Sequence, residues 1–152
     1  ELRPGGVFGA VALERLADSE FSEGVRSRNQ ENLTRAEAIY RQLVEKNEGA
    51  AVYSAGFKLG RTLEEEKKTR SALTVYKELL YRALTAREKG ETIEPIWVSK
   101  AAYAAINLNL RKNNPNAARE ALRLIELIKA LKLQSSEDFD RIAEEILNKY
   151  RI

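Results

Sequence analysis

The side chains of this chain that could do chemistry are carboxylates, cations and a few aromatics, because the sequence contains no histidine, cysteine or methionine. A zinc site built from cysteine and histidine is therefore excluded, and so is a nucleophile paired with histidine. Glu64, Glu65 and Glu66 form a carboxylate run that could bind a metal or transfer protons. Lys67 and Lys68 follow directly, so we expect a solvated turn here instead of a site.

Two further groups of residues have plainer explanations than a binding site. Gly5, Gly6 and Gly9 are spaced loosely like a phosphate loop, but no strand precedes them and no Gly-Lys-Ser/Thr follows. Trp97 and Tyr103 could stack a ligand, although aromatics at this spacing are more often packed between helices. Since no group of residues favours catalysis, we expect neither an enzyme nor a cofactor or metal site.

The basic residues do not concentrate on one segment. The net charge is +3, from 26 basic and 23 acidic residues that interleave along the chain. Arg111, Lys112, Arg119 and Arg123 could contact phosphate, but acids and turns lie between them, so a solvated face is expected. We therefore predict no nucleic-acid partner.

Composition and length favour one all-helical domain. The chain has 152 residues, of which 32% are charged and 7% aromatic, with only three prolines. No apolar run reaches the roughly 18 residues of a membrane span, so membrane insertion is not expected. Hydrophobic residues recur with a helical period, Gly49 suits a left-handed helix cap, and Pro95 suits a first helical turn. These signals predict seven helices, near residues 7–28, 32–46, 50–65, 69–89, 95–112, 116–133 and 136–152.

A set of small and large residues recurs at fixed spacing along the chain. Starting from Gly24, the next members lie 12, 16 and 19 residues further on, and the same offsets hold from Gly60 and from Asn109. A small residue on one helix can then face a small residue on the next, while a large residue fills the space between hairpins. A single hairpin cannot bury both of its faces, so neighbours must stack. The three sets are Gly24, Ala36, Tyr40, Leu43; Gly60, Ala72, Tyr76, Leu79; and Asn109, Ala121, Ile125, Ile128.

This pattern resembles the tetratricopeptide repeat family. Leu59, Gly60, Ala72 and Tyr76 match that family's positions well, with Leu63 at its first-helix aromatic position. The first hairpin matches on its second helix, at Ala36 and Tyr40, and departs on its first. The third keeps the spacing, but has Asn109 in place of the glycine and Ile125 in place of the tyrosine. The resemblance implies an all-α, right-handed α-solenoid of antiparallel helix hairpins, with a single domain over 1–152. Its repeats would span 17–50, 53–90 and 95–133, and 136–152 would form a capping helix. The alternative is a helical bundle whose spacing arises by chance.

The resemblance also implies a concave groove lined by the first helix of each hairpin. Its positions lie three residues before the glycine position, then one and four residues after it. Apolar anchors alternate there with polar tips, which suits a peptide or helix segment of another protein. The same apolar residues could equally belong to the core. The positions are Phe21, Val25, Arg28, Phe57, Arg61, Glu64, Ile106, Leu110 and Asn113.

Three expectations about function follow. We expect a non-catalytic scaffold or adaptor that binds another protein in the groove; the alternative is a structural subunit that forms homo-oligomers through its convex face or its C-terminal helix. The carboxylate clamp of some family members is not expected, since Arg61 is the only cation at the second set of positions. The absence of an initiator methionine and of cysteine favours a piece of a longer bacterial protein, exported or periplasmic.

Overall fold

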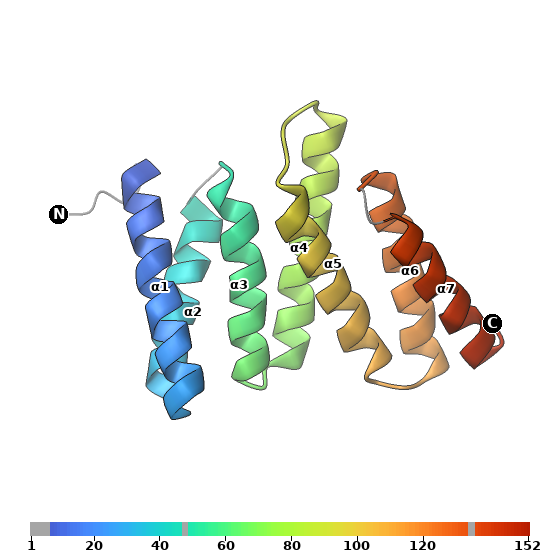
Figure 1. Cartoon of the computed structure of the whole chain (residues 1–152), viewed down its shortest axis with the longest axis horizontal. Coiled ribbons are helices and arrows are strands. Elements are labelled where there is room, and N and C mark those ends of the chain that lie inside the picture. Colours follow the sequence, from blue (N-terminus) through green and yellow to red (C-terminus); the bar gives the residue numbers. More distant parts are fainter. Residues whose placement is uncertain (1–6, 47–48, 134–135) are drawn as a thin grey trace. The chain divides into compact units, whose positions relative to one another are not determined.

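The computed structural model describes residues 7–46, 49–133 and 136–152, and in these ranges the chain is entirely helical. Within the described residues seven helices occur and no strand, as the sequence predicted (Figure 1). None of the described helices is long and apolar enough to cross a lipid bilayer. The helices are α1 (Val7–Ser27), α2 (Gln30–Lys46), α3 (Ala51–Glu65), α4 (Thr69–Glu88), α5 (Pro95–Leu110), α6 (Pro115–Ala130) and α7 (Ser136–Tyr150).

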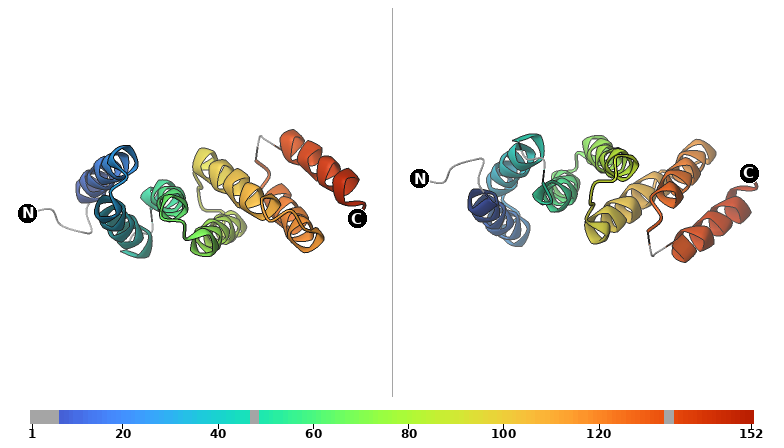
Figure 2. Two further views of the ribbon diagram at one scale, coloured as in Figure 1. Left: turned by 90° about the horizontal axis from the view of Figure 1, so that it is seen from below. Right: turned by 90° about the horizontal axis from the view of Figure 1, so that it is seen from above.

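The chain divides into two compact units, Glu1–Val75 and Tyr76–Ile152, and the boundary lies inside α4. In the first unit α1 packs against α2, and both pack against α3. In the second unit α5 packs against α6, and α6 packs against α7. Figure 2 shows these neighbouring helices from two further sides. Consecutive helices thus form antiparallel pairs, which is the coarse architecture that the repeat predicted.

The repeated positions are buried in all three hairpins. Gly24 lies against Leu33 of the next helix: a Cβ atom at Gly24 would come within 2.8 Å of the Leu33 Cδ2 atom and 3.1 Å of its backbone nitrogen. The glycine is therefore needed for the close approach of α1 and α2. Every other member of the three sets is also buried: Ala36, Tyr40, Leu43, Gly60, Ala72, Tyr76, Leu79, Asn109, Ala121, Ile125 and Ile128.

Helix ends are closed by left-handed residues, most of which are not glycine. Arg28, Lys67 and Gly90 have φ angles of 53°, 65° and 74°. In each case the next residue's N–H bonds to a carbonyl five residues back, at 2.8–3.0 Å, which satisfies carbonyls that a helix end leaves open. The expectation for Gly49 is wrong, because its φ is not in the left-handed region. Pro95 does stand in the first turn of α5.

Candidate functional site

Six of the nine predicted groove residues lie in the first unit, on α1 and α3 or just beyond their ends. Val25 is the most accessible apolar one, with 42% of its surface exposed. Phe21 and Phe57 are half-buried. Arg61 is exposed and forms an ion pair with Glu64 at 3.4 Å. These side chains can therefore reach a partner at least in part.

The other predicted groove residues are less accessible to a partner or lie beyond the ends of the helices. Arg28 follows the end of α1 as a left-handed turn residue. Asn113 is likewise left-handed, beyond the end of α5, and its side-chain oxygen accepts a 2.9 Å hydrogen bond from the Tyr150 hydroxyl. Leu110 is half-buried. Ile106 is only 1% exposed, so it belongs to the core of the second unit and offers no surface to a ligand.

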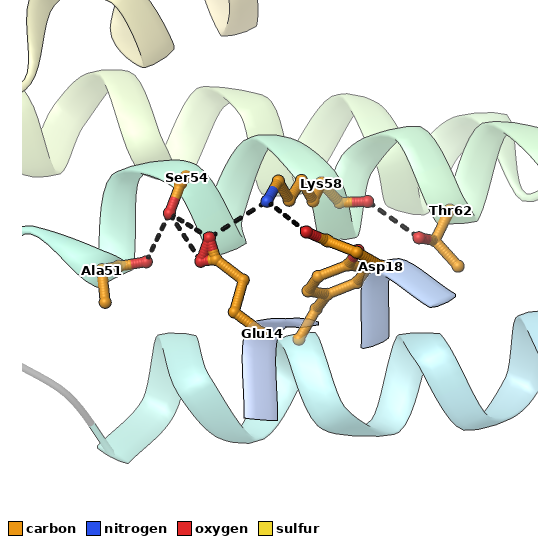
Figure 3. A network of polar contacts seen from close by, with 7 residues as sticks. Glu14, Asp18, Ala51, Ser54, Lys58 and Thr62 are labelled. Atoms are coloured by element: carbon orange, nitrogen blue, oxygen red, sulfur yellow. Dashed lines mark hydrogen bonds and ion pairs between the residues drawn. The ribbon is translucent and has the colours of Figure 1, made fainter. Parts of the chain in front are cut away.

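A polar network that sequence reasoning missed joins α1 to α3 (Figure 3). The Lys58 ammonium on α3 lies 3.1 Å from a Glu14 carboxylate oxygen and 3.0 Å from an Asp18 oxygen on α1. The Ser54 hydroxyl lies 2.7 Å from Glu14 and is in reach of both of its oxygens. Since one cation faces two carboxylates, the network retains a formal charge of about −1.

Tyr40 of α2 also belongs to this network. Its hydroxyl donates a short hydrogen bond to Asp18 while its ring is buried in the first unit. Burial, together with the bond to Asp18, raises the pKa of the Tyr40 hydroxyl, so the group remains a donor throughout the physiological pH range. Three helices are thus tied together at Asp18.

The spacing of the polar residues could have pointed to this network. Glu14 and Asp18 are four residues apart on one helix, and Ser54 and Lys58 are four apart on the other, so each pair occupies one helix face. What the sequence does not supply is the register between α1 and α3, which lie 40 residues apart in the chain.

The register also aligns the residues that follow. On α1 the face continues from Glu14 and Asp18 to Phe21 and Val25, at steps of four, three and four residues. On α3 it continues with the same steps, and helix geometry places such residues in one row. We call these two rows the α1–α3 face: Glu14, Asp18, Phe21 and Val25 with Ser54, Lys58, Arg61 and Glu65.

The acidic run predicted to be a solvated turn contains a buried carboxyl group. The side chain of Glu66 is only 1% exposed. One of its oxygens accepts a hydrogen bond from Gln30 at 3.1 Å and lies 3.2 Å from the Lys68 ammonium, while the other is buried without a partner among the described residues. Lys68 also binds Glu37 at 2.9 Å. The expectation is therefore wrong for Glu66, because the α3–α4 turn packs against α2.

The pKa values of the neighbouring carboxyls Glu66 and Glu37 are shifted in opposite directions. Burial and the neighbouring Glu37 raise the pKa of Glu66. Burial also opposes ionisation of Glu37, but the Lys68 hydrogen bond and the charge of Arg41 outweigh it and lower the Glu37 pKa. As the pH falls, Glu66 is therefore protonated before Glu37. This cluster contains no further acidic ligand, and no metal-binding group of three such residues occurs in the described ranges.

The aromatic and basic candidates of the second unit have structural partners. Tyr103 stacks on Phe139 of α7 with ring centroids 4.6 Å apart, and its hydroxyl donates to Asp138 at 3.0 Å. Trp97 is half-buried, with the Lys100 ammonium 4.7 Å from its ring centre. Arg123 pairs with Glu120 at 3.2 Å.

No protein-family model, no curated protein and no solved structure matches this chain.

Proposed function

We propose that this protein is a non-catalytic scaffold of the tetratricopeptide kind that binds a segment of another protein on its α1–α3 face. The observation that carries the proposal is the burial of all twelve repeated positions, as stacked hairpins require, while the two rows of the α1–α3 face stay partly exposed, most of all at Val25 and Arg61. Repeat proteins of stacked hairpins use such rows as binding surfaces.

The composition of the face suits a peptide or helix segment. Val25 and the half-buried Phe21 supply apolar contact on α1, while Arg61 supplies an exposed cation on α3. Apolar anchors beside oriented polar groups are typical of peptide recognition. The Lys58 network holds the two rows in register, so the face is pre-organised and less entropy is lost when a partner binds.

Affinity capture with matched variants tests this proposal. The face variant combines Val25→Asp with Arg61→Glu, two changes at accessible positions. The control variant combines Leu16→Asp with Arg70→Glu. Leu16 is 49% exposed and lies nine residues before Val25, which places it on about the opposite side of α1. Circular dichroism must show that all three proteins are folded.

The expected result is that proteins retained by the wild type and by the control variant are identified by mass spectrometry and are lost from the face variant. Proteins retained equally by all three would place the interface elsewhere. If the wild type retains no protein and its mass in solution rises with concentration, self-association explains the data better. Leu147 of α7, which is 43% exposed, is then the first residue to test.

A further inference from the structure

A pocket of about 740 Å³ opens in the second unit, whereas the α1–α3 face belongs to the first. It lies where the last turn of α4, the first turns of α5 and residues Lys132 and Leu133 after α6 meet. This volume is within the roughly 300–1,000 Å³ of ligand pockets in proteins. The pocket therefore has room for side chains of a bound molecule.

The charged residues that line the pocket are all basic. Arg87, Lys100 and Lys132 line it, and no acidic residue does. Arg87 and Lys132 are exposed and form no ion pair with the part of the chain that the structure describes. The lining residue Tyr103 donates its hydroxyl hydrogen bond to Asp138, which is not itself among the lining residues. The pocket is a positive patch on a chain whose charges otherwise interleave.

Apolar side chains lie among these cations. Pro95, Ile96 and Leu133 also line the pocket. Ile96 is 61% exposed, the largest exposed fraction among the big apolar residues described. An exposed large apolar side chain beside Arg87 and Lys132, which have no ion pair among the described residues, indicates an occupant that is itself both apolar and anionic.

We propose that this pocket binds a peptide segment in which acidic residues flank an apolar side chain. Arg87 and Lys132 come from two different segments of the chain, so one carboxylate cannot neutralise both, whereas successive acidic residues of a peptide can. The apolar side chain between those acids would cover Ile96. The inference rests on the proposed function in one respect, since the ligand is part of another protein.

Nuclear magnetic resonance titration of the full chain with defined probes tests the inference. The first probe is a heptapeptide pool in which Asp or Glu alternates with Leu, Ile or Phe. The second has the same pattern with Asn and Gln in place of the acids. The third is decanoate, an apolar chain with a single carboxylate. We expect the acidic pool to shift the backbone amide signals of Ser99, Lys100 and Lys132, and the amide pool to leave them unchanged.

Two pairs of variants, each with one change in the pocket and one outside it, test which side chains contribute to binding. Lys132→Glu should weaken binding of the acidic pool by about tenfold, because an attraction becomes a repulsion. The control is Arg82→Glu: Arg82 is an exposed residue of α4 outside the pocket, and its change should alter binding by less than about twofold. Ile96→Ser should also weaken binding, and Tyr81→Ser should not, although Tyr81 is 58% exposed. Higher salt should weaken binding to the wild type.

Three results would overturn the inference: no shift of the pocket signals by the acidic pool, equal loss of binding in Lys132→Glu and Arg82→Glu, or decanoate binding as tightly as the peptides. The last would indicate a pocket for small organic acids. The outcome is distinguishable from that of the proposed function. Capture through Val25 and Arg61 without peptide binding here would defeat only the pocket, and peptide binding here without such capture would defeat only the α1–α3 face.

Discussion

At the scale of single residues, the features with most consequence are charged groups that are partly or almost wholly shielded from water. Lys58 holds two carboxylates from another helix, and Glu66 keeps one oxygen buried without a partner. A buried polar atom without a hydrogen-bond partner lowers the stability of the folded chain, so it persists only where the surrounding packing offsets that loss. Both residues sit at contacts between helices that are far apart in the sequence.

Glu66→Gln should stabilise the protein at neutral pH. Because the folded-state pKa of Glu66 is raised, its ionisation lowers the stability of the folded chain as pH rises above the unfolded value of 4.5. A neutral amide removes this cost and can donate a hydrogen bond to Glu37. Unfolding in urea should show a gain of about 0.5–1.5 kcal/mol at pH 7.

The gain should shrink as the pH falls towards 4.5, since wild-type Glu66 then becomes protonated as well. Glu37 acts in the opposite sense: its lowered pKa contributes stability above 4.5 that is lost below it, in both proteins. Glu65→Gln is the control, with an expected change within about 0.5 kcal/mol. A gain in stability that is the same at pH 4.5 and pH 7 would contradict the raised pKa of Glu66.

Lys58→Met should destabilise the chain by about 1–2 kcal/mol, because Glu14 and Asp18 lose their shared cation and repel each other. The loss stays below that of a fully buried pair since Asp18 remains 42% exposed. Urea unfolding measures it. In a chain that already carries Glu14→Gln and Asp18→Asn, the same lysine change should cost much less, and an equal cost would mean that Lys58 acts through its packing alone.

At the scale of helices, the sequence predicted most of what the structure shows. Hydrophobic period and turn residues gave seven helices whose starts lie within two residues of those observed. The spacing from Gly24 to Ala36 anticipated which residues are buried between helices. The left-handed turns were harder to anticipate, because Arg28 and Lys67 adopt a conformation that favours glycine. The backbone hydrogen bonds from Asn29 to Gly24 and from Lys68 to Leu63 stabilise this conformation.

The candidate site was predicted less well than the helices, for a physical reason. Local pattern identifies which residues of one helix share a face, but not which residues of another helix lie opposite them. Ile106 was therefore assigned to a groove although it is core, and the contact of Lys58 with Asp18 was missed. Such contacts depend on tertiary register, which packing of the whole unit determines.

Gly24→Ala tests the close approach of α1 and α2. The added methyl group meets Leu33, which is 6% exposed and cannot swing into solvent. Overpacking of about 1–3 kcal/mol should outweigh the gain of up to about 1 kcal/mol in helix propensity. The control is Gly49→Ala, where no atom lies within 4 Å and which should be neutral or slightly stabilising. Equal urea midpoints for the two variants would refute the contact.

At the scale of the whole molecule, the decisive feature is α4, which begins in one compact unit and ends in the other. Its backbone hydrogen bonds run across the boundary, so neither unit can lose its part of the helix without affecting the other. Nearest-neighbour coupling of this kind makes stacked helical hairpins unfold together. The two units are therefore expected to share one unfolding transition.

Ala72→Glu tests this coupling. Ala72 is fully buried in the first unit, so the change should destabilise it by at least about 1–3 kcal/mol through overpacking, with a further cost for the buried charge. Trp97 is the only tryptophan and lies in the second unit, so its fluorescence reports on that unit. We expect the Trp97 midpoint to fall together with the midpoint from circular dichroism.

The control for this experiment is Ser71→Glu, an adjacent exposed position in the first turn of α4 where an acidic side chain is tolerated. A Trp97 transition that stays at its wild-type midpoint while circular dichroism shows two steps would mean that the units unfold independently.

The left-handed turns have a consequence for digestion by proteases. Arg28, Lys67 and Lys132 are all exposed, and each follows the end of a helix within one or two residues. Trypsin cleaves after arginine and lysine, and exposed connections are cut before helices are. Brief digestion should therefore release pieces made of whole helices, such as residues 29–67, which hold α2 and α3 together.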